Sequence, residues 1–388
     1  MNNFELGIDS MQNTIISEVF LTKGALNKQA VIRKYMSQCA LASKDLAFIF
    51  FSEDDYESTS FSDYECDTFK LMGIGDYRKM LAVIDGQIVN VSEKIRPIVE
   101  LDLNIMSYYW KHSRGESLPS NINTDKMIDL LNYIKSNNYV VDFSSAAFER
   151  ASTLRNNYDE ECFKGMIESI LRFKSEELLA DEYFSETLKT KDLISSNGIA
   201  KSYDFIYCML LKAYILKHSG INSPKKRVTS FIDFCFNDLN CPLENELYLI
   251  TKYLENDKSV FSLFEKVNGS PKRPLAELKN ITWDIFHFRL LEFIIGHYFS
   301  PESIPLLYLA SNDKKLTNPM SINPVIGLAI NMRTKKVTPQ HLYNITQDYP
   351  DLTEKYGTLT AAEKRKNIVE HYDIKAKIAE LETEIANS

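Results

Sequence analysis

The chain has 388 residues, 44% of them apolar and 25% charged, and its formal net charge at pH 7 is −8. This composition is that of a globular protein long enough for two or three domains. The acidic balance argues against a protein that coats nucleic acid non-specifically, but it does not exclude a local basic groove. The most apolar segment, residues 290–299, is too short to span a bilayer, so we expect no membrane partner.

The cysteines and the first residues indicate the compartment. Six cysteines are scattered along the chain without the spacing of a zinc site. The first ten residues, "MNNFELGIDS", have neither the basic nor the apolar part of a signal peptide. We therefore expect a reduced, cytoplasmic protein.

Residues 1–95 are expected to form a mixed α+β N-terminal region. Residues 29–43 have helical spacing, and residues 45–51 read as a buried strand. Two apolar runs around Asp85 and Gly86 predict a hairpin, because Asp-Gly is a favoured turn pair. No chemistry is predicted in this region.

A different pattern begins at Pro97. A short strand at 98–102 precedes a helix start, and Asn123 or Thr124 can cap a helix over 125–138. A strand, "YVVDFSS", and another helix, "AAFERASTLRNN", follow. This alternation of strands and helices predicts a parallel sheet flanked by helices.

The rest of the chain is mostly helical in pattern. Residues 156–280 predict a helical bundle, 283–298 an apolar helix, 304–310 a strand, and 331–388 a polar helical tail. The tail spaces four apolar residues like a short heptad seam: Ile374, Ile378, Leu381 and Ile385. This seam either docks on its own domain or pairs with a protein partner or a second copy.

Four acids stand at related places in this pattern. Asp102 ends a strand, and Glu149 lies early in the helix that follows the strand "VVDF". Asp284 lies at the start of the apolar helix 283–298, and Asp313 ends the next strand. The carboxyl ends of parallel strands meet at one edge of a sheet, where ligands bind. Converging carboxylates need a hard cation, Mg²⁺ or Mn²⁺. Such a site suits the hydrolysis of phosphodiester bonds.

The same stretches resemble the motifs of PIN-like domain nucleases. "VELDLNIMSYY" resembles the first motif, a strand followed by D-x-N and a helix. "VVDFSSAAFERA" is similar to the second motif, and "TWDIFHFRLLE" to the third. "PLLYLASNDKKL" resembles the fourth, a strand followed by Ser/Thr-x-Asp. The resemblance covers roughly 97–155 and 281–320.

The resemblance implies a PIN-like parallel sheet, here residues 96–155 plus 281–330, interrupted by a helical insertion at 156–280. It implies a metal-dependent nuclease, usually acting on RNA and often serving as a toxin or in antiviral defence. The four acids would hold the metals, and Asn104 and Ser311 would orient ligands or bind phosphate. Lys314 either contacts phosphate or is only exposed to solvent.

Several alternatives stay open. Glu100, on the same strand face as Asp102, is an extra ligand or a rim charge. Asp204 also begins an apolar helix and could replace Asp284. The acids could instead be helix caps or turn residues, and His287 is more simply a core histidine. The chain would then be a non-catalytic interaction or scaffold protein that works through its helical insertion and its C-terminal helix.

Overall fold

A computed structural model describes residues 3–38, 43, 45–51, 53–153, 160–196, 199–241, 243–269, 271–313, 316, 320–351 and 372–387. The chain divides into two compact units. Unit 1 comprises Met1–Asn197, Leu290–Thr317 and Val325–Gln340, and unit 2 comprises Gly198–Arg289, Asn318–Pro324 and His341–Ser388. With 59% helix and 18% strand, the fold is of the expected mixed α/β class.

The helices of the described residues are α1 (Asn3–Leu21), α2 (Ala25–Gln38), α4 (Leu103–Ser113), α5 (Thr124–Ser136), α6 (Ser144–Thr153), α7 (Glu160–Lys174), α8 (Ala180–Ser196), α9 (Ile199–His218), α10 (Pro224–Asp233), α11 (Glu244–Glu255), α12 (Phe261–Phe264), α13 (Pro274–Tyr298), α15 (Ile345–Asp348) and α18 (Ile374–Ala386). The strands are β1 (Leu46–Phe51), β2 (Glu57–Ser58), β3 (Tyr64–Cys66), β4 (Phe69–Gly73), β5 (Lys79–Ile84), β6 (Gln87–Val89), β7 (Ile95–Leu101), β8 (Val140–Asp142), β9 (Ile304–Ser311), β10 (Val325–Asn331) and β11 (Val337–His341).

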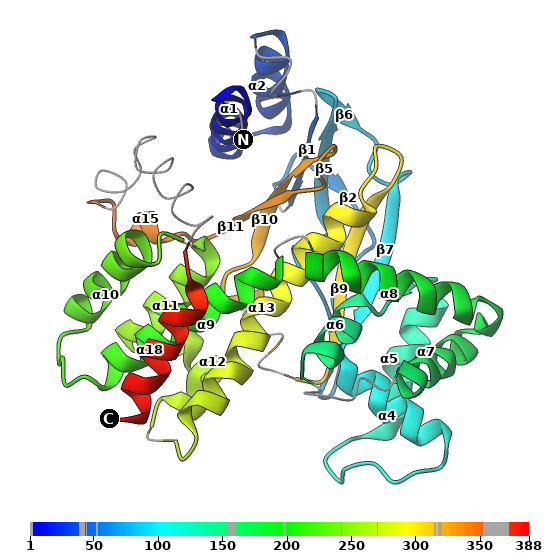
Figure 1. The fold of residues 1–388 in the computed structure, drawn as a ribbon. Helices are drawn as coiled ribbons and strands as arrows, with labels where there is room; N and C mark the ends of the chain where they lie inside the picture. Colours follow the sequence, from blue (N-terminus) through cyan, green and yellow to red (C-terminus); the bar gives the residue numbers. More distant parts are fainter. Residues whose placement is uncertain are drawn as a thin grey trace. The chain divides into compact units, whose positions relative to one another are not determined.

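The first sheet of unit 1 has the strand order β11-β10-β1-β5-β2, and β6 also pairs with β5. The helices α1 and α2 lie side by side next to β1 (Figure 1) and bury apolar residues such as Val19 and Ile32 against Phe48 of β1. The predicted hairpin is confirmed as β5 and β6. Its turn residues Asp85 and Gly86 have φ values of 50° and 68°, as a tight hairpin turn requires.

The second sheet of unit 1 has the order β3-β4-β9-β7-β8. Its strands β9, β7 and β8 are parallel, with Leu101 opposite Ala310 and Glu100 opposite Asp142. The parallel pairing expected of these three strands is therefore confirmed. The sequence did not predict that β4 adds to β9 in the antiparallel direction, which makes the sheet mixed.

Helices of unit 1 pack against this second sheet. The helix α5 packs against β3 and β4, and α6 packs against β7. Asn123 caps α5 as predicted, because its side chain accepts a hydrogen bond of 3.2 Å from the backbone N–H of Lys126. The helices α7 and α8 pack against α4 and α6, so they belong to unit 1. This division differs from the predicted limits, which placed both helices in an insertion over residues 156–280.

Unit 2 is helical. Its central helix, α9, is buried over most of its circumference, and α18 packs on it. All four residues of the heptad-like seam are buried: Ile374, Ile378, Leu381 and Ile385. The C-terminal helix therefore docks on its own unit.

The structure corrects two expectations. The helix α13 begins at Pro274 rather than near residue 283, so Asp284 lies inside the helix and not at its start. Proline suits a first helical turn, because its missing N–H has no intrahelical partner there. The segment 331–388 is not wholly helical, since Val337–His341 forms β11 at the end of the first sheet, where an edge strand tolerates Pro339. Within the described residues, every helix is too short or too polar to cross a membrane.

Candidate active site

Asp102 stands where β7 passes into α4, and three elements fix its position. It is the N-cap of α4, and its Oδ1 accepts a hydrogen bond of 3.2 Å from the backbone N–H of Asn104. Its own backbone N–H donates to the carbonyl oxygen of Ala310, in β9, at 3.0 Å. The side chain is only 4% exposed. Asp102 is thus a helix cap, as one alternative expected, and is also joined to the neighbouring strand.

Ser311 connects Asp102 to Asp313. Its hydroxyl donates a hydrogen bond of 2.6 Å to Oδ2 of Asp102. The same hydroxyl oxygen accepts a hydrogen bond of 2.9 Å from the backbone N–H of Asp313. Because β7 and β9 are parallel neighbours, their carboxyl ends bring these three residues together.

Electrostatic coupling also places Asp313 near Asp102. Burial raises the pKa of Asp102 above its ordinary value, and the charge of Asp313 raises it further. The hydrogen bonds from Ser311 and Asn104 act in the opposite direction. Burial likewise raises the pKa of Tyr108 in α4, with contributions from the charges of Asp102 and Asp313. The two carboxylates therefore repel each other, and a cation between them would be favourable.

A second pair of carboxyl groups joins the neighbouring strands β7 and β8. Glu100 is fully buried and stands opposite Asp142 in the adjacent strand β8. The hydroxyl of Ser145 donates a hydrogen bond to Oε2 of Glu100. Asp142 accepts at Oδ1 from the backbone N–H of Ser144, at 2.7 Å, and at Oδ2 from the hydroxyl of Tyr298. The start of α6 therefore supplies a donor to each of the two carboxyl groups, and the end of α13 supplies a second donor to Asp142.

Glu100 is neither an exposed rim charge nor an ordinary buried anion. Burial holds the pKa of Glu100 well above its usual range, and the neighbouring charge of Asp142 adds to this effect. No donor in the described part of the chain reaches its Oε1. In its protonated form, which the raised pKa favours, Glu100 can donate a hydrogen bond to Asp142.

The other predicted site residues have different positions. Glu149 is half-buried on α6, one helical turn beyond Ser145. The exposed Asn104 contributes its backbone N–H to Asp102. Asp313 is half-buried, and Lys314 lies outside the described residues.

Three further candidates belong to unit 2, whereas Asp102 belongs to unit 1. They are therefore not part of the site that unit 1 forms around Asp102. Asp284 is half-buried inside α13. Asp204 forms an ion pair of 2.7 Å with Lys375 of α18. His287 is buried, as expected of a core histidine, and burial lowers its pKa to about 4.

Sequence reasoning missed Asp142 and Tyr298. The signal for Asp142 was present, because it ends an apolar strand directly before a Ser-rich helix start, as Asp102 ends β7 before α4. Tyr298 had no such signal, since it ends α13, far along the chain from Asp142. Only the packing of the last turn of α13 brings its hydroxyl to Asp142.

In the residues that the structure describes, no three His, Cys, Asp or Glu side chains are grouped so that they could hold a metal ion. The pair Asp102 and Asp313 is compatible with Mg²⁺, which proteins commonly bind through one or two carboxylates while it keeps several waters. The oxygen-only donors and the repulsion between the two carboxylates fit such a hard cation.

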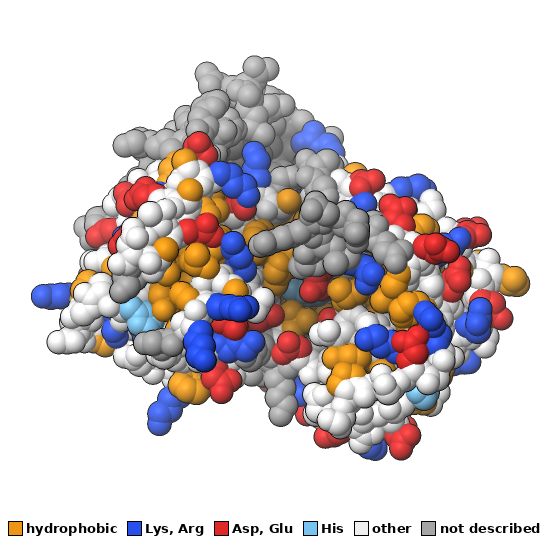
Figure 2. Space-filling model, turned by 60° about the horizontal axis from the view of Figure 1, so that its bottom comes forward, with side chains coloured by type: hydrophobic (Ala, Val, Ile, Leu, Met, Phe, Trp, Pro, Cys, Tyr) orange, Lys and Arg blue, Asp and Glu red, His pale blue; other side chains and the backbone are white. Residues whose placement is uncertain are grey.

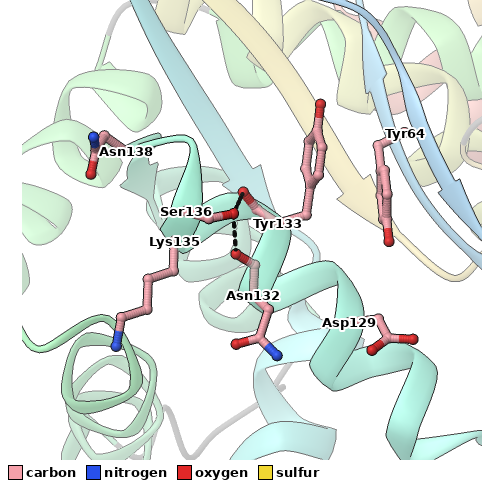
Figure 3. Close-up of a pocket in the computed structure, with 7 residues that line it drawn as sticks. All are labelled: Tyr64, Asp129, Asn132, Tyr133, Lys135, Ser136 and Asn138. Carbon is pink, nitrogen blue, oxygen red and sulfur yellow. Dashed lines mark hydrogen bonds between the residues drawn. The ribbon is translucent and has the colours of Figure 1, made fainter.

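A shallow groove of about 610 Å³ lies along α5 beside β3, and Figure 3 shows its lining residues. The rings of Tyr64 and Tyr133 stack there, with centroids 4.1 Å apart. None of the predicted acids lines this groove. On the face shown in Figure 2, acidic and basic side chains are interspersed.

The chain matches no model of a protein family, no curated protein and no solved structure. A fold class alone does not determine an activity. Function is therefore argued from the geometry of the acids.

Proposed function

We propose that unit 1 is a PIN-like, metal-dependent nuclease that hydrolyses phosphodiester bonds in RNA. The observation that carries the proposal is the bridge of hydrogen bonds from Asp102 through Ser311 to Asp313, at the carboxyl ends of two parallel strands. This edge of a sheet is the usual place for a ligand in an open α/β fold. A role as a toxin or in antiviral defence, in the cytoplasm, belongs to the same proposal and rests on the resemblance.

Asp102 and Asp313 would hold Mg²⁺ or Mn²⁺. A cation would offset both the burial of Asp102 and its repulsion by Asp313, the two effects that raise the pKa of Asp102. When bound, such an ion makes water a stronger nucleophile and stabilises the negative charge on the leaving oxygen.

The surrounding residues fix the carboxylate before any ligand arrives. The hydroxyl of Ser311 holds one oxygen of Asp102, and the N–H of Asn104 holds the other. Each carboxylate oxygen has a second lone pair, so both can still accept from a ligand or a cation. This preorganisation avoids the entropic cost of ordering the side chain on binding.

Glu100 and Glu149 would support the site from β7 and α6. Glu100 binds the hydroxyl of Ser145 and so anchors the start of α6. Glu149 lies on the same face of α6 as Ser145, because residues four apart are neighbours on a helix. The proposal does not use Asp284 or Asp204, which belong to unit 2.

The alternative of a non-catalytic scaffold loses one of its predicted surfaces. That reading relied on the apolar seam of the C-terminal helix as a docking face. The four seam residues are buried within unit 2, against α9.

Cleavage of labelled single-stranded RNA and single-stranded DNA, each with Mg²⁺, Mn²⁺ or a chelator, tests the proposal. We expect cleavage of RNA that needs the metal and that falls at least about a hundredfold in Asp102→Asn, since weaker supporting groups already contribute tenfold to hundredfold. The matched control is Asp129→Asn, the same change at an exposed pair with Lys126. Equal cleavage by the two variants would refute the assignment of Asp102.

A further inference from the structure

A second pocket of unit 1, of about 640 Å³, lies between the strand β8 and the helix α8. It is separate from the groove along α5, with which it shares no lining residue. Among the side chains that line it are Arg96, Asp142, Glu182, Tyr183, Glu186 and Tyr298.

One residue of the pocket wall, Asp142, belongs to a buried carboxyl pair that has no cationic partner among the described residues. Asp142 lines the pocket and is 5% exposed, and its partner Glu100 is fully buried. Oε1 of Glu100 receives no hydrogen bond from the described residues. No lysine, arginine or histidine described in the structure forms an ion pair with either carboxyl group. Proteins seldom bury a carboxylate without a cation or a full set of donors, so the negative charge that remains on Asp142 is one that a cation entering the pocket would stabilise.

The lining as a whole carries more negative than positive charge. Four carboxylates line the pocket, from Asp142, Asp181, Glu182 and Glu186, against the two cations Arg96 and Lys189. Two of these carboxylates already have cationic partners, because Asp181 pairs with Lys164 at 2.6 Å and Glu186 with Lys189 at 3.5 Å. Asp142 and Glu182 remain to attract a positively charged ligand.

Aromatic rings complete the surface. The guanidinium of Arg96 lies 5.5 Å from the ring centroid of Tyr298, so this ring already accepts a cation on its face. Tyr183 lines the same pocket. Carboxylates combined with tyrosine faces recognise organic cations through ion pairing and cation–π attraction.

We propose that this pocket binds a small organic cation, a molecule with ammonium or guanidinium groups of which one reaches Asp142. A bare metal ion fits less well, because the cavity is far larger than an ion. The pocket uses neither Asp102 nor Asp313. Cation binding in the pocket can therefore be tested separately from the proposed nuclease activity.

Isothermal titration of the full chain with spermidine and with agmatine, at physiological ionic strength, tests the proposal. We expect saturable binding of at least one of these cations, and binding about tenfold weaker in Asp142→Asn, as for the loss of one charged hydrogen bond. Asp129→Asn removes the same charge outside the pocket and should leave the affinity unchanged. Absence of saturable binding, or equal weakening in both variants, would overturn the proposal.

A second variant tests the sign of the ligand's charge and avoids the buried pair. Arg96 is exposed, so Arg96→Gln should fold normally. It removes a positive charge that competes for the ring of Tyr298, and we expect spermidine or agmatine to bind severalfold more tightly. Titration with adenosine monophosphate supplies the anionic probe. Weaker cation binding in Arg96→Gln, or binding of the anion in place of both cations, would contradict the proposal.

Discussion

The hydroxyl of Ser311 donates a hydrogen bond of 2.6 Å to Oδ2 of Asp102, across a sequence separation of 209 residues. The two residues meet because β7 and β9 are adjacent parallel strands that end at the same edge of the sheet. Both side chains are buried. A buried carboxylate that loses such a donor is costly to keep ionised, so this bond matters for stability and for the candidate site.

Ser311→Ala should lower the free energy of unfolding of unit 1 by about 1–3 kcal/mol, the cost of removing one donor from a buried charged acceptor. Urea unfolding followed by the fluorescence of Trp110, in a Trp283→Phe background, measures this change within unit 1. The control Ser113→Ala removes an exposed hydroxyl that bonds only the carbonyl oxygen of Trp110. Equal unfolding midpoints for the two serine variants would argue against an important role of the Ser311 bond.

The buried carboxyl pair predicts a pH dependence of stability. The raised pKa of Glu100 means that the native state keeps a proton that the unfolded chain, with its usual value of 4.5, has lost. Above pH 4.5 the native state therefore binds more protons, and the free energy of unfolding falls as pH rises, by at most about 1.4 kcal/mol per pH unit. Glu100→Gln removes this contribution.

Urea unfolding of Glu100→Gln and of wild type at a series of pH values tests that expectation. The free energy of unfolding of the variant should fall less steeply from pH 4.5 to neutrality than that of wild type. The exposed Glu116, paired with Arg114, provides the control Glu116→Gln. Parallel curves for Glu100→Gln and wild type would mean that Glu100 titrates normally.

In unit 2, Arg289 holds both oxygens of Glu246 at 2.8 Å and 2.7 Å, and the side chain of Glu246 is 1% exposed. Arg289→Met leaves this carboxylate buried without its cation, which should cost about 3–5 kcal/mol. Lys375→Met breaks the pair of an exposed lysine with the half-buried Asp204 and should cost at most about 1 kcal/mol. Urea unfolding followed by the fluorescence of Trp283, in a Trp110→Phe background, measures the stability of both variants. Equal losses of unfolding free energy in Arg289→Met and Lys375→Met would contradict the claim that burial makes the Glu246 pair the more important one.

The docking of α18 on α9 predicts that this helix stabilises its own unit. Leu381 is 1% exposed, and Leu381→Ala should cost about 2–5 kcal/mol through lost burial and a residual cavity. The exposed Glu384 on the same helix provides the control Glu384→Ala. Analytical ultracentrifugation should give the same molar mass for wild type and Leu381→Ala. A reduced mass without a loss of stability would instead indicate that the seam pairs two chains.

The sequence predicted the local parts of the candidate site well. Apolar runs that end in an acid before a helix located the ends of β7 and β9, because strand burial and helix capping leave clear patterns. It did not predict the partner of Glu100, because the pairing of Glu100 with Asp142 depends on the register of β7 and β8. The hydroxyl of Tyr298 reaches Asp142 through packing, which also leaves no local pattern.

The division into units was harder to predict than the elements themselves. The helices α7 and α8 have the same apolar spacing as the helices of unit 2, and only their packing on α4 and α6 assigns them to unit 1. Asp284 was misplaced for a similar reason. The apolar stretch around it suggested a helix start, whereas α13 begins at Pro274 in a more polar sequence.

The most direct test of the central claim is a titration of the chain with Mn²⁺ followed by electron paramagnetic resonance, which measures free and bound ion without any substrate. The account predicts saturable binding in wild type and in Asp129→Asn, and binding weakened at least about tenfold in Asp102→Asn. Wild-type affinity in Asp102→Asn, or no saturable binding in wild type, would contradict a metal site at Asp102 and Asp313.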